Sequence, residues 1–177
     1  CFHCGTTGRD GAARVFHQYA FEEVLPAASR SPRKVHLNSW EALAFEMDLP
    51  RLVQLVDDAA ALGIERFVLD DGWFAGRRND RSSLGDWTPD AMLFPDGLGP
   101  LVERVHARGM DFGLWVEPEM ISPDSALYRA HPDWCLRGEG AERPSQRHQL
   151  VLDLTRTEVA DYLFEALDRL LCDYPIA

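Results

Sequence analysis

The sequence contains no apolar run of the length that a membrane-spanning helix requires. Positive charge is also scarce, because 18 lysine and arginine residues stand against 29 aspartate and glutamate residues, for a formal net charge of -11. A charge of this sign repels the phosphates of nucleic acids and the surfaces of anionic lipids. We therefore expect no nucleic-acid partner and no membrane partner. A neutral ligand suits the chain better.

Cysteine occurs only four times, at Cys1, Cys4, Cys135 and Cys172. Cys1 and Cys4 have the spacing of half a zinc site, but a second such pair, or a histidine pair at ligand spacing, is missing nearby. We favour two ordinary reduced thiols, and we expect no metal and no cofactor. The first residues also lack the charged, apolar and small-residue order of a signal peptide, so we expect a cytoplasmic protein.

Material for a packed core is plentiful. The chain is 46% hydrophobic and has 5 tryptophan and 9 phenylalanine residues among its 177. Short apolar segments alternate with longer segments of helical periodicity, and turn signals separate them. The pattern predicts strands at residues 35–40, 66–71, 112–119 and 150–155, and helices at residues 14–25, 49–62, 98–108, 125–130 and 157–172.

Four strand–helix units in a row, with nearly continuous apolar strands, predict a parallel sheet covered by helices. The right-handed crossovers of such a sheet lead either to an open layer or to a barrel. A complete (β/α)8 TIM barrel takes about 250 residues. We therefore expect only the first four β/α units of a barrel at residues 31–177, with Ile176 beginning a fifth strand. Residues 1–30 are expected to form a lead-in segment and a helix.

Polar and aromatic residues gather at the carboxyl ends of the predicted strands, where the active sites of such barrels assemble. A carboxylate accepts several hydroxyl hydrogen bonds, and an indole covers the apolar face of a pyranose ring, so this mixture suits a neutral sugar. The residues at the four strand ends are Asn38 and Trp40, then Asp70, Asp71 and Trp73, then Trp115, Glu117 and Glu119, and finally Asp153.

Each of these residues also has a purely structural interpretation. Asp-Asp-Gly is a turn sequence, and single tryptophans such as Trp40 and Trp115 are more often core residues than ligand platforms. Glu117 can pair with an arginine, Arg147 is by default a surface residue, and Asp153 could be a structural acid. A metal-dependent hydrolase built on the strand-end acids is a weaker alternative, because histidines, the usual transition-metal partners, are lacking at the strand ends.

Six stretches, in the order LNSWEA, FVLDDGWF, NDRSSLGDW, FGLWVEPEMISPDS, HPDW and RHQLVLDLTRTEV, support a sharper interpretation. Together they resemble the barrel domain of the bacterial alpha-galactosidases of glycoside hydrolase family 36, from about Phe16 to the last residue. The resemblance implies a retaining alpha-galactosidase that hydrolyses terminal alpha-linked galactose from oligosaccharides such as melibiose and raffinose.

The resemblance also assigns site residues. It implies that Asp70 and Asp71 bind galactose, that Trp40 and Trp115 are pocket tryptophans, and that Arg147 is the arginine just before the fourth strand. The family has asparagine where this chain has His148. Two adjacent acids in a recessed pocket repel each other unless a cation such as Arg147 offsets their charge.

The catalytic residues of the family are expected elsewhere. The resemblance places the nucleophilic aspartate in a Lys-Trp-Asp segment at the end of the fifth strand, beyond this chain, and the acid/base aspartate farther on. Since a retaining glycosidase needs both carboxyl groups, we expect this chain to recognise galactose without cleaving the bond. A galactosyl-transferring relative, an alpha-N-acetylgalactosaminidase and a non-catalytic sugar-binding fragment remain alternatives, and a homo-oligomer is a possible assembly.

Overall fold

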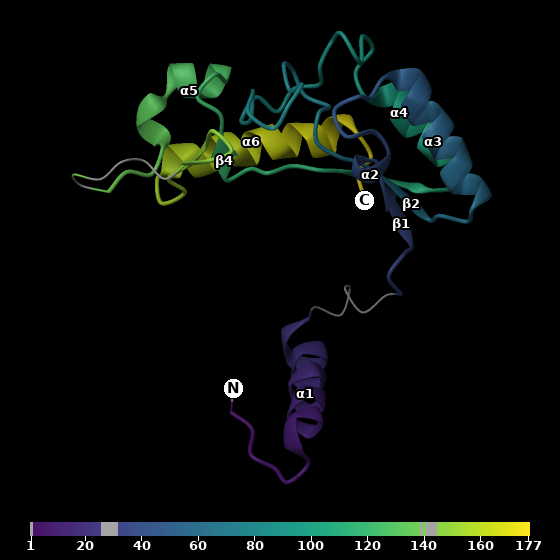
Figure 1. Cartoon of the computed structure of the whole chain (residues 1–177), viewed down its shortest axis with the longest axis vertical. Helices are drawn as coiled ribbons and strands as arrows, with labels where there is room; N and C mark the ends of the chain where they lie inside the picture. Colours follow the sequence, from purple (N-terminus) through teal and green to yellow (C-terminus); the bar gives the residue numbers. More distant parts are fainter. Residues whose placement is uncertain (1, 26–31, 139, 141–144) are drawn as a thin grey trace. The chain divides into compact units, whose positions relative to one another are not determined.

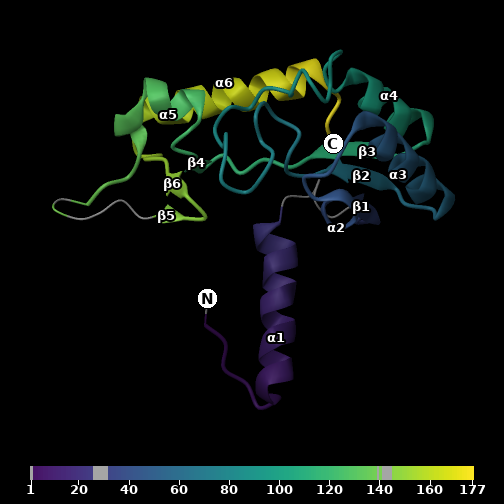
Figure 2. The ribbon, with the colours of Figure 1, turned by 45° about the horizontal axis from the view of Figure 1, so that its top comes forward.

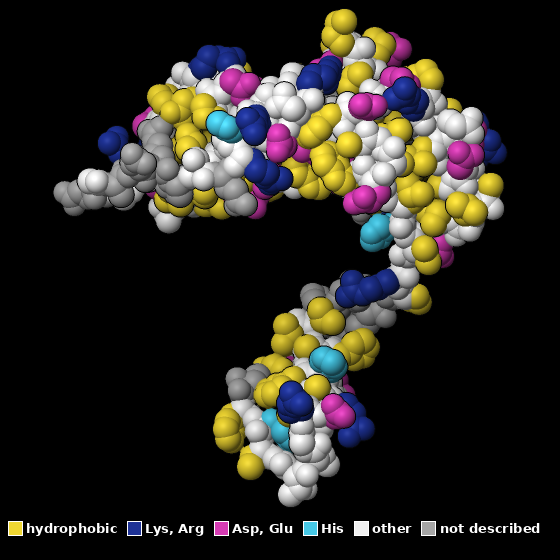
Figure 3. All heavy atoms as spheres, in the orientation of Figure 1, with side chains coloured by type: hydrophobic (Ala, Val, Ile, Leu, Met, Phe, Trp, Pro, Cys, Tyr) yellow, Lys and Arg dark blue, Asp and Glu magenta, His cyan; other side chains and the backbone are white. Residues whose placement is uncertain are grey.

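The computed structural model describes residues 2–25, 32–138, 140 and 145–177, which fall into two units, residues 1–34 and 35–177. In the first unit, helix α1 (Gly8–Tyr19) continues into a π-helical turn, η1 (Ala20–Val24). The predicted helix therefore begins six residues earlier than expected, at Gly8 rather than at residue 14. Hydrophobic side chains are exposed along it, among them Val15, Phe16 and Tyr19 (Figure 3).

The second unit contains a parallel sheet in the order β1 (His36–Asn38), β2 (Arg66–Leu69), β3 (Asp111–Leu114). These are the first three predicted strands, each shorter than expected. Beyond β3, Ile176 forms a parallel bridge with Phe112. The parallel sheet therefore continues at Ile176.

The predicted fourth strand exists in part, at β6, but its predicted place in the parallel sheet is wrong. Residues 150–155 do not join the parallel sheet; instead β6 (Gln149–Val151) pairs antiparallel with both β4 (Met120–Ile121) and β5 (Ser145–Gln146). The place beside β3 is taken instead by Ile176, which was expected at the start of a fifth strand and forms an isolated parallel bridge with Phe112. A short apolar segment looks alike in parallel and antiparallel sheets, because its sequence does not specify its partner. The described residues hold three parallel strands, so four barrel units are not confirmed.

Helices cover the parallel sheet much as the periodicity predicted. Helix α3 (Leu49–Ala61) begins where the Asp48 carboxylate accepts a 2.8 Å hydrogen bond from the Arg51 backbone N–H, and it ends before Gly63. Helix α4 (Gly99–Ala107) lies beside α3 (Figures 1 and 2). Their buried residues form one core with the strands; it includes Leu52, Val56, Phe67, Leu101, Val105 and Phe112. Within the described residues, no helix combines the length and apolar character needed to cross a membrane.

A second core lies around the antiparallel sheet, between α5 (Ala126–Ala130), the short 3-10 helix η3 (Pro132–Trp134) and α6 (Thr157–Asp173). Its buried residues include Ile121, Leu127, Trp134, Leu150, Val159 and Leu163. Two large apolar residues of α6, Phe164 and Leu171, are 70% and 59% exposed. They follow the buried Leu163 and Leu170 by one residue each, so they lie on an adjacent stripe of the helix. A short helix, α2 (Trp40–Leu43), follows β1.

Candidate functional site

A cavity of about 790 Å³ opens at the carboxyl ends of β1, β2 and β3. Its lining contains all five residues that the sequence singled out for binding: Trp40, Asp70, Asp71, Trp115 and Arg147. The rest of the lining consists of Asn38, Glu41, Phe45, Asp80, Val116, Glu117 and Glu119. Segments that lie more than 100 residues apart in the chain therefore meet at one cavity.

Asp70 is fixed by groups from two neighbouring strand ends. Its Oδ1 accepts a 2.7 Å hydrogen bond from the backbone N–H of Asp71, and its Oδ2 accepts one from the side-chain amide of Asn38. Its own backbone N–H donates to Ser39 Oγ at 3.0 Å. The turn interpretation of Asp-Asp-Gly also holds, because Gly72 has a φ of 106°, a conformation that favours glycine. The turn and the cavity therefore use the same residues.

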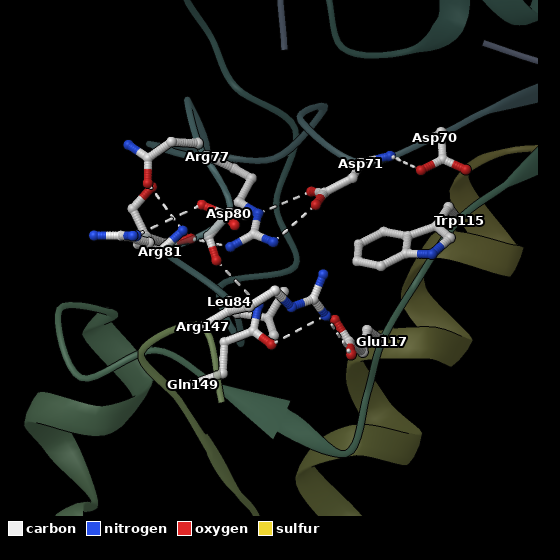
Figure 4. Close-up of polar contacts among 12 residues, drawn as sticks. Asp70, Asp71, Arg77, Asp80, Arg81, Leu84, Trp115, Glu117, Arg147 and Gln149 are labelled. Atoms are coloured by element: carbon white, nitrogen blue, oxygen red, sulfur yellow. Dashed lines mark hydrogen bonds and ion pairs between the residues drawn. The ribbon is translucent and has the colours of Figure 1, made fainter. Parts of the chain in front are cut away.

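Asp71 forms a buried ion pair with Arg77. Arg77 Nε donates to Asp71 Oδ1 at 2.8 Å and Arg77 Nη2 donates to Oδ2 at 2.7 Å (Figure 4). The side chain of Asp71 is 9% exposed and that of Arg77 is 1% exposed. The sequence suggested Arg147 as the cation that offsets the paired acids, but the structure gives this position to Arg77. In the sequence, Arg77 lies in a polar loop and looks like a surface residue, so only its closeness to Asp71 in the chain hinted at the pairing.

The two cavity tryptophans are held in different ways. Trp40 was expected within a strand, but β1 ends at Asn38 and Trp40 begins α2. Its backbone N–H donates to Asn38 Oδ1 at 2.8 Å, and its ring lies edge-on to Phe45 with the ring centroids 5.0 Å apart. Trp115 follows β3, and its backbone N–H donates to the Leu69 carbonyl oxygen at 2.9 Å. Both indoles are half-buried, and both line the cavity.

Arg147 lies in the two-residue turn between β5 and β6. Its Nη2 is 3.6 Å from Glu117 Oε1 and 3.5 Å from Gln149 Oε1, and its side chain is 52% exposed (Figure 4). Glu117 therefore pairs with an arginine, as one of the interpretations held. Burial raises the pKa of Glu117 above its ordinary value; the charge of Arg147 opposes this rise, and the charge of Glu119 adds to it.

Two candidates from the predicted strand ends, Trp73 and Asp153, do not line the cavity. The Asp153 carboxylate accepts hydrogen bonds from the Thr155 hydroxyl at 2.6 Å and from the Thr155 backbone N–H at 3.1 Å, which lower the pKa of Asp153.

Among the residues that the structure describes, no group of three or more histidine, cysteine, aspartate and glutamate side chains could hold a metal ion. Cys4 is a free thiol, whereas Cys1 lies outside the described residues.

A family model described as Melibiase matches residues 2–177. The chain belongs to the melibiase family. This melibiase segment is 44% identical over 169 residues to the "Alpha-galactosidase" of Escherichia coli, a match that covers 96% of the segment and 24% of the relative. The resemblance to the bacterial alpha-galactosidases of glycoside hydrolase family 36 is confirmed, and the segment spans about a quarter of the length of the curated relatives that it matches.

Solved structures give the same result in three dimensions. The melibiase segment matches a variant of the family 36 alpha-galactosidase AgaA of Geobacillus stearothermophilus in complex with 1-deoxygalactonojirimycin. The TM-score is 0.93 at 42% identity, over 98% of the segment and 24% of that chain. A second variant of AgaA, in complex with raffinose, matches with a TM-score of 0.82 at 46% identity, over 86% of the segment and 21% of that chain.

Proposed function

We propose that this segment is the galactose-recognising part of a retaining alpha-galactosidase, which removes terminal alpha-linked galactose from oligosaccharides such as melibiose and raffinose. The single observation that carries the proposal is the cavity at the ends of the parallel strands, where the adjacent acids Asp70 and Asp71, two indoles and an arginine meet. In this proposal the parallel strands belong to a (β/α)8 barrel, whose binding sites lie at this end of the strands.

The donors and acceptors of the lining suit a hexose. Each oxygen of the Asp70 carboxylate accepts one hydrogen bond within the protein and keeps a second lone pair for a sugar hydroxyl. The indole of Trp115 can cover the apolar C–H face of the ring. Arg147 can donate to a hydroxyl oxygen from its exposed side. Those hydrogen bonds that tighten in the transition state would accelerate the reaction.

The relatives support the same ligand class. One solved relative holds 1-deoxygalactonojirimycin, an imino sugar of galactose configuration, and another holds raffinose. Both match this segment over most of its length, so a neutral oligosaccharide with a terminal alpha-galactose is the partner that we propose.

The bond-breaking carboxylates of the proposed enzyme lie in other segments of it. The resemblance places the nucleophile at the end of the strand that follows α6, and the parallel bridge between Ile176 and Phe112 supports a start of this strand beside β3. The nucleophile would therefore emerge next to Trp115 and Glu117, at the same cavity. A retaining mechanism also requires an acid/base carboxyl about 5 to 5.5 Å from the nucleophile.

Turnover of p-nitrophenyl alpha-galactoside by the protein that carries this segment tests the proposal. Asp70→Ala and Trp115→Ala should each lower kcat/KM by at least about 100-fold, because sugar hydroxyls and a ring face lose their partners. Asp153→Ala is the matched control, since this acid also follows a predicted strand but does not line the cavity. Wild-type turnover by the Asp70 and Trp115 variants would refute the assignment.

The alternatives have distinguishable products. A galactosyl-transferring enzyme yields longer oligosaccharides instead of free galactose, and an alpha-N-acetylgalactosaminidase prefers the N-acetylated nitrophenyl substrate. A sugar-binding protein without catalysis would bind galactose but release no nitrophenol.

We further propose a cytoplasmic location, which cell fractionation would test. We also propose a homo-oligomeric assembly, which light scattering during size-exclusion chromatography would test.

A further inference from the structure

Arg77 uses its guanidinium entirely within the protein. Two of its nitrogens bind Asp71, and the third, Nη1, donates to the carbonyl oxygen of Ser82 at 2.8 Å. The guanidinium carbon lies 5.7 Å from the ring centroid of Phe45 and 5.7 Å from that of Phe74. With its side chain 1% exposed, Arg77 is a desolvated cation that cannot reach a ligand in the cavity.

A buried ion pair of this kind is weak evidence for a stabilising role. The desolvation of the two charges offsets most of their attraction, and an apolar pair of the same volume is often as stable. The guanidinium does fix the orientation of the carboxylate, because its two parallel N–H···O bonds hold both carboxylate oxygens at once. The Asp71 carboxylate therefore has one orientation relative to the cavity that it lines.

Orientation matters at Asp71 because so little of its side chain is accessible. Only 9% of the side chain is exposed, so a small rotation would remove its contribution to the cavity surface. Each Asp71 oxygen accepts one N–H from Arg77 and retains a lone pair that a sugar hydroxyl could use. The positive charge of Arg77 also offsets the negative charge of Asp71, which reduces the repulsion between Asp71 and the neighbouring Asp70.

The same arginine ties the loop after β2 to the site. Arg77 holds the carbonyl of Ser82, and between these two residues lies Asp80, which lines the cavity. The Asp80 carbonyl oxygen in turn accepts a 3.2 Å hydrogen bond from Gln149 Nε2, on the strand next to Arg147 (Figure 4). These hydrogen bonds, together with the backbone from Asp80 to Ser82, therefore join Asp71 to the Arg147 side of the cavity.

We propose that Arg77 is a positioning residue for galactose recognition, which acts by holding the Asp71 carboxylate in its binding orientation and not by touching the sugar. The proposal rests on the proposed function, since it takes the cavity to be the galactose site. It predicts that the effect of Arg77 on turnover passes chiefly through Asp71, to which the guanidinium donates two of its hydrogen bonds.

A double-mutant cycle in the protein that carries this segment tests the inference, with kcat and KM measured on p-nitrophenyl alpha-galactoside. Arg77→Met and Asp71→Asn should each lower kcat/KM at least about 30-fold. The double variant should be no worse than Asp71→Asn alone, because the arginine then has no carboxylate to hold. Arg77→Lys keeps the charge without the fork, and its KM should rise at least about tenfold.

Arg104→Met is the matched control. Arg104 also binds both oxygens of an aspartate, Asp57, but this pair joins α3 and α4 and does not line the cavity. Its loss should lower the midpoint of thermal unfolding and leave KM within about twofold of the wild type. A general effect of breaking an arginine–aspartate pair is thereby separated from positioning.

The outcomes separate the inference from the proposed function. Wild-type turnover by Asp70→Ala and Trp115→Ala would refute the proposed function. If those two variants lose activity while Arg77→Lys keeps a wild-type KM, or if the losses of Arg77→Met and Asp71→Asn multiply in the double variant, the inference is overturned. Should Arg77→Met fail to fold, Arg77→Lys and the double variant, which leaves no unpaired buried charge, decide the matter.

Discussion

The indole N–H of Trp73 donates a 2.9 Å hydrogen bond to the backbone carbonyl oxygen of Trp115. Trp73 follows β2 and is fully buried, whereas Trp115 follows β3 and lines the cavity. The bond therefore joins the carboxyl ends of two neighbouring strands directly beneath the candidate site. It also fixes the backbone that carries one of the two cavity indoles.

Replacing Trp73 by phenylalanine should lower the free energy of unfolding by about 1 to 3 kcal/mol, because the Trp115 carbonyl loses its partner. Trp87→Phe is the matched control: Trp87 is also buried, but its indole N–H has no hydrogen-bond partner among the described residues. Replacing Trp87 removes an unsatisfied polar group, so it should lower the free energy of unfolding by less than replacing Trp73. Urea denaturation of the two variants measures both values, and equal losses would contradict the role given to the Trp73 hydrogen bond.

Glu117 should make stability fall as the pH rises. Because burial raises its pKa in the folded state, that state binds the proton more tightly than the unfolded chain does. Stability is then lost as the pH rises from the unfolded pKa through the raised folded pKa. Glu117→Gln removes this effect, so the variant should gain stability relative to wild type as the pH rises above the ordinary glutamate pKa of 4.5. Denaturant titrations at a series of pH values above 4.5, with Glu103→Gln at an exposed residue of α4 as control, measure the gain; a pH-independent difference would argue against it.

Asp57 should have the opposite dependence. Hydrogen bonds from Arg108 and Arg104 lower the pKa of Asp57 to about 2. Its contribution to stability is therefore present above the unfolded pKa and is lost as the pH falls through about 2. Asp57→Asn should lower the midpoint of thermal unfolding at neutral pH, and the difference from wild type should shrink on acidification. Asp58→Asn, at an exposed residue of the same helix that accepts a hydrogen bond from the neutral Gln54, is the matched control.

The turn at Arg147 and His148 should tolerate glycine at its second residue. Both residues have positive φ, 50° and 57°, as the tight turn between β5 and β6 requires. His148→Gly should raise the free energy of unfolding by up to about 1 kcal/mol, since glycine adopts this conformation without a clash. His148→Ala keeps the Cβ and should bring no gain. Denaturation of the two variants compares them, and a loss of stability in His148→Gly would contradict the argument.

The sequence predicted the parallel sheet and its helices well where periodicity and terminal signals agreed. Helix α3 shows this best: Asp48, Pro50 and Gly63 mark its ends, and its buried face follows the apolar spacing. The parallel pairing predicted for residues 150–155 was wrong because their apolar pattern indicates a strand but does not specify its partner strand. Ile176, near the end of the chain, takes the place beside β3, and only the folded chain decides between such competitors.

The candidate site was anticipated by residue type and strand position but not in its connections. Asp70, Asp71, Trp40, Trp115 and Arg147 line one cavity, whereas Arg77, which controls the Asp71 carboxylate, was missed. An arginine in a polar loop is ordinarily solvated. Its burial arises from Phe45, Phe74 and Asp71, which come together only in the tertiary structure.

By itself, the sequence determined the three parallel strands, the helices that cover them and the chemical character of the residues at the strand ends. These follow from local periodicity, from turn residues and from the rule that the ends of parallel strands share one edge. The tertiary structure alone decided which strand neighbours β3 and which cation compensates Asp71. Both choices depend on contacts between segments distant in the chain, where the energy of burying a charge or pairing a strand is set by the partner and not by the local sequence.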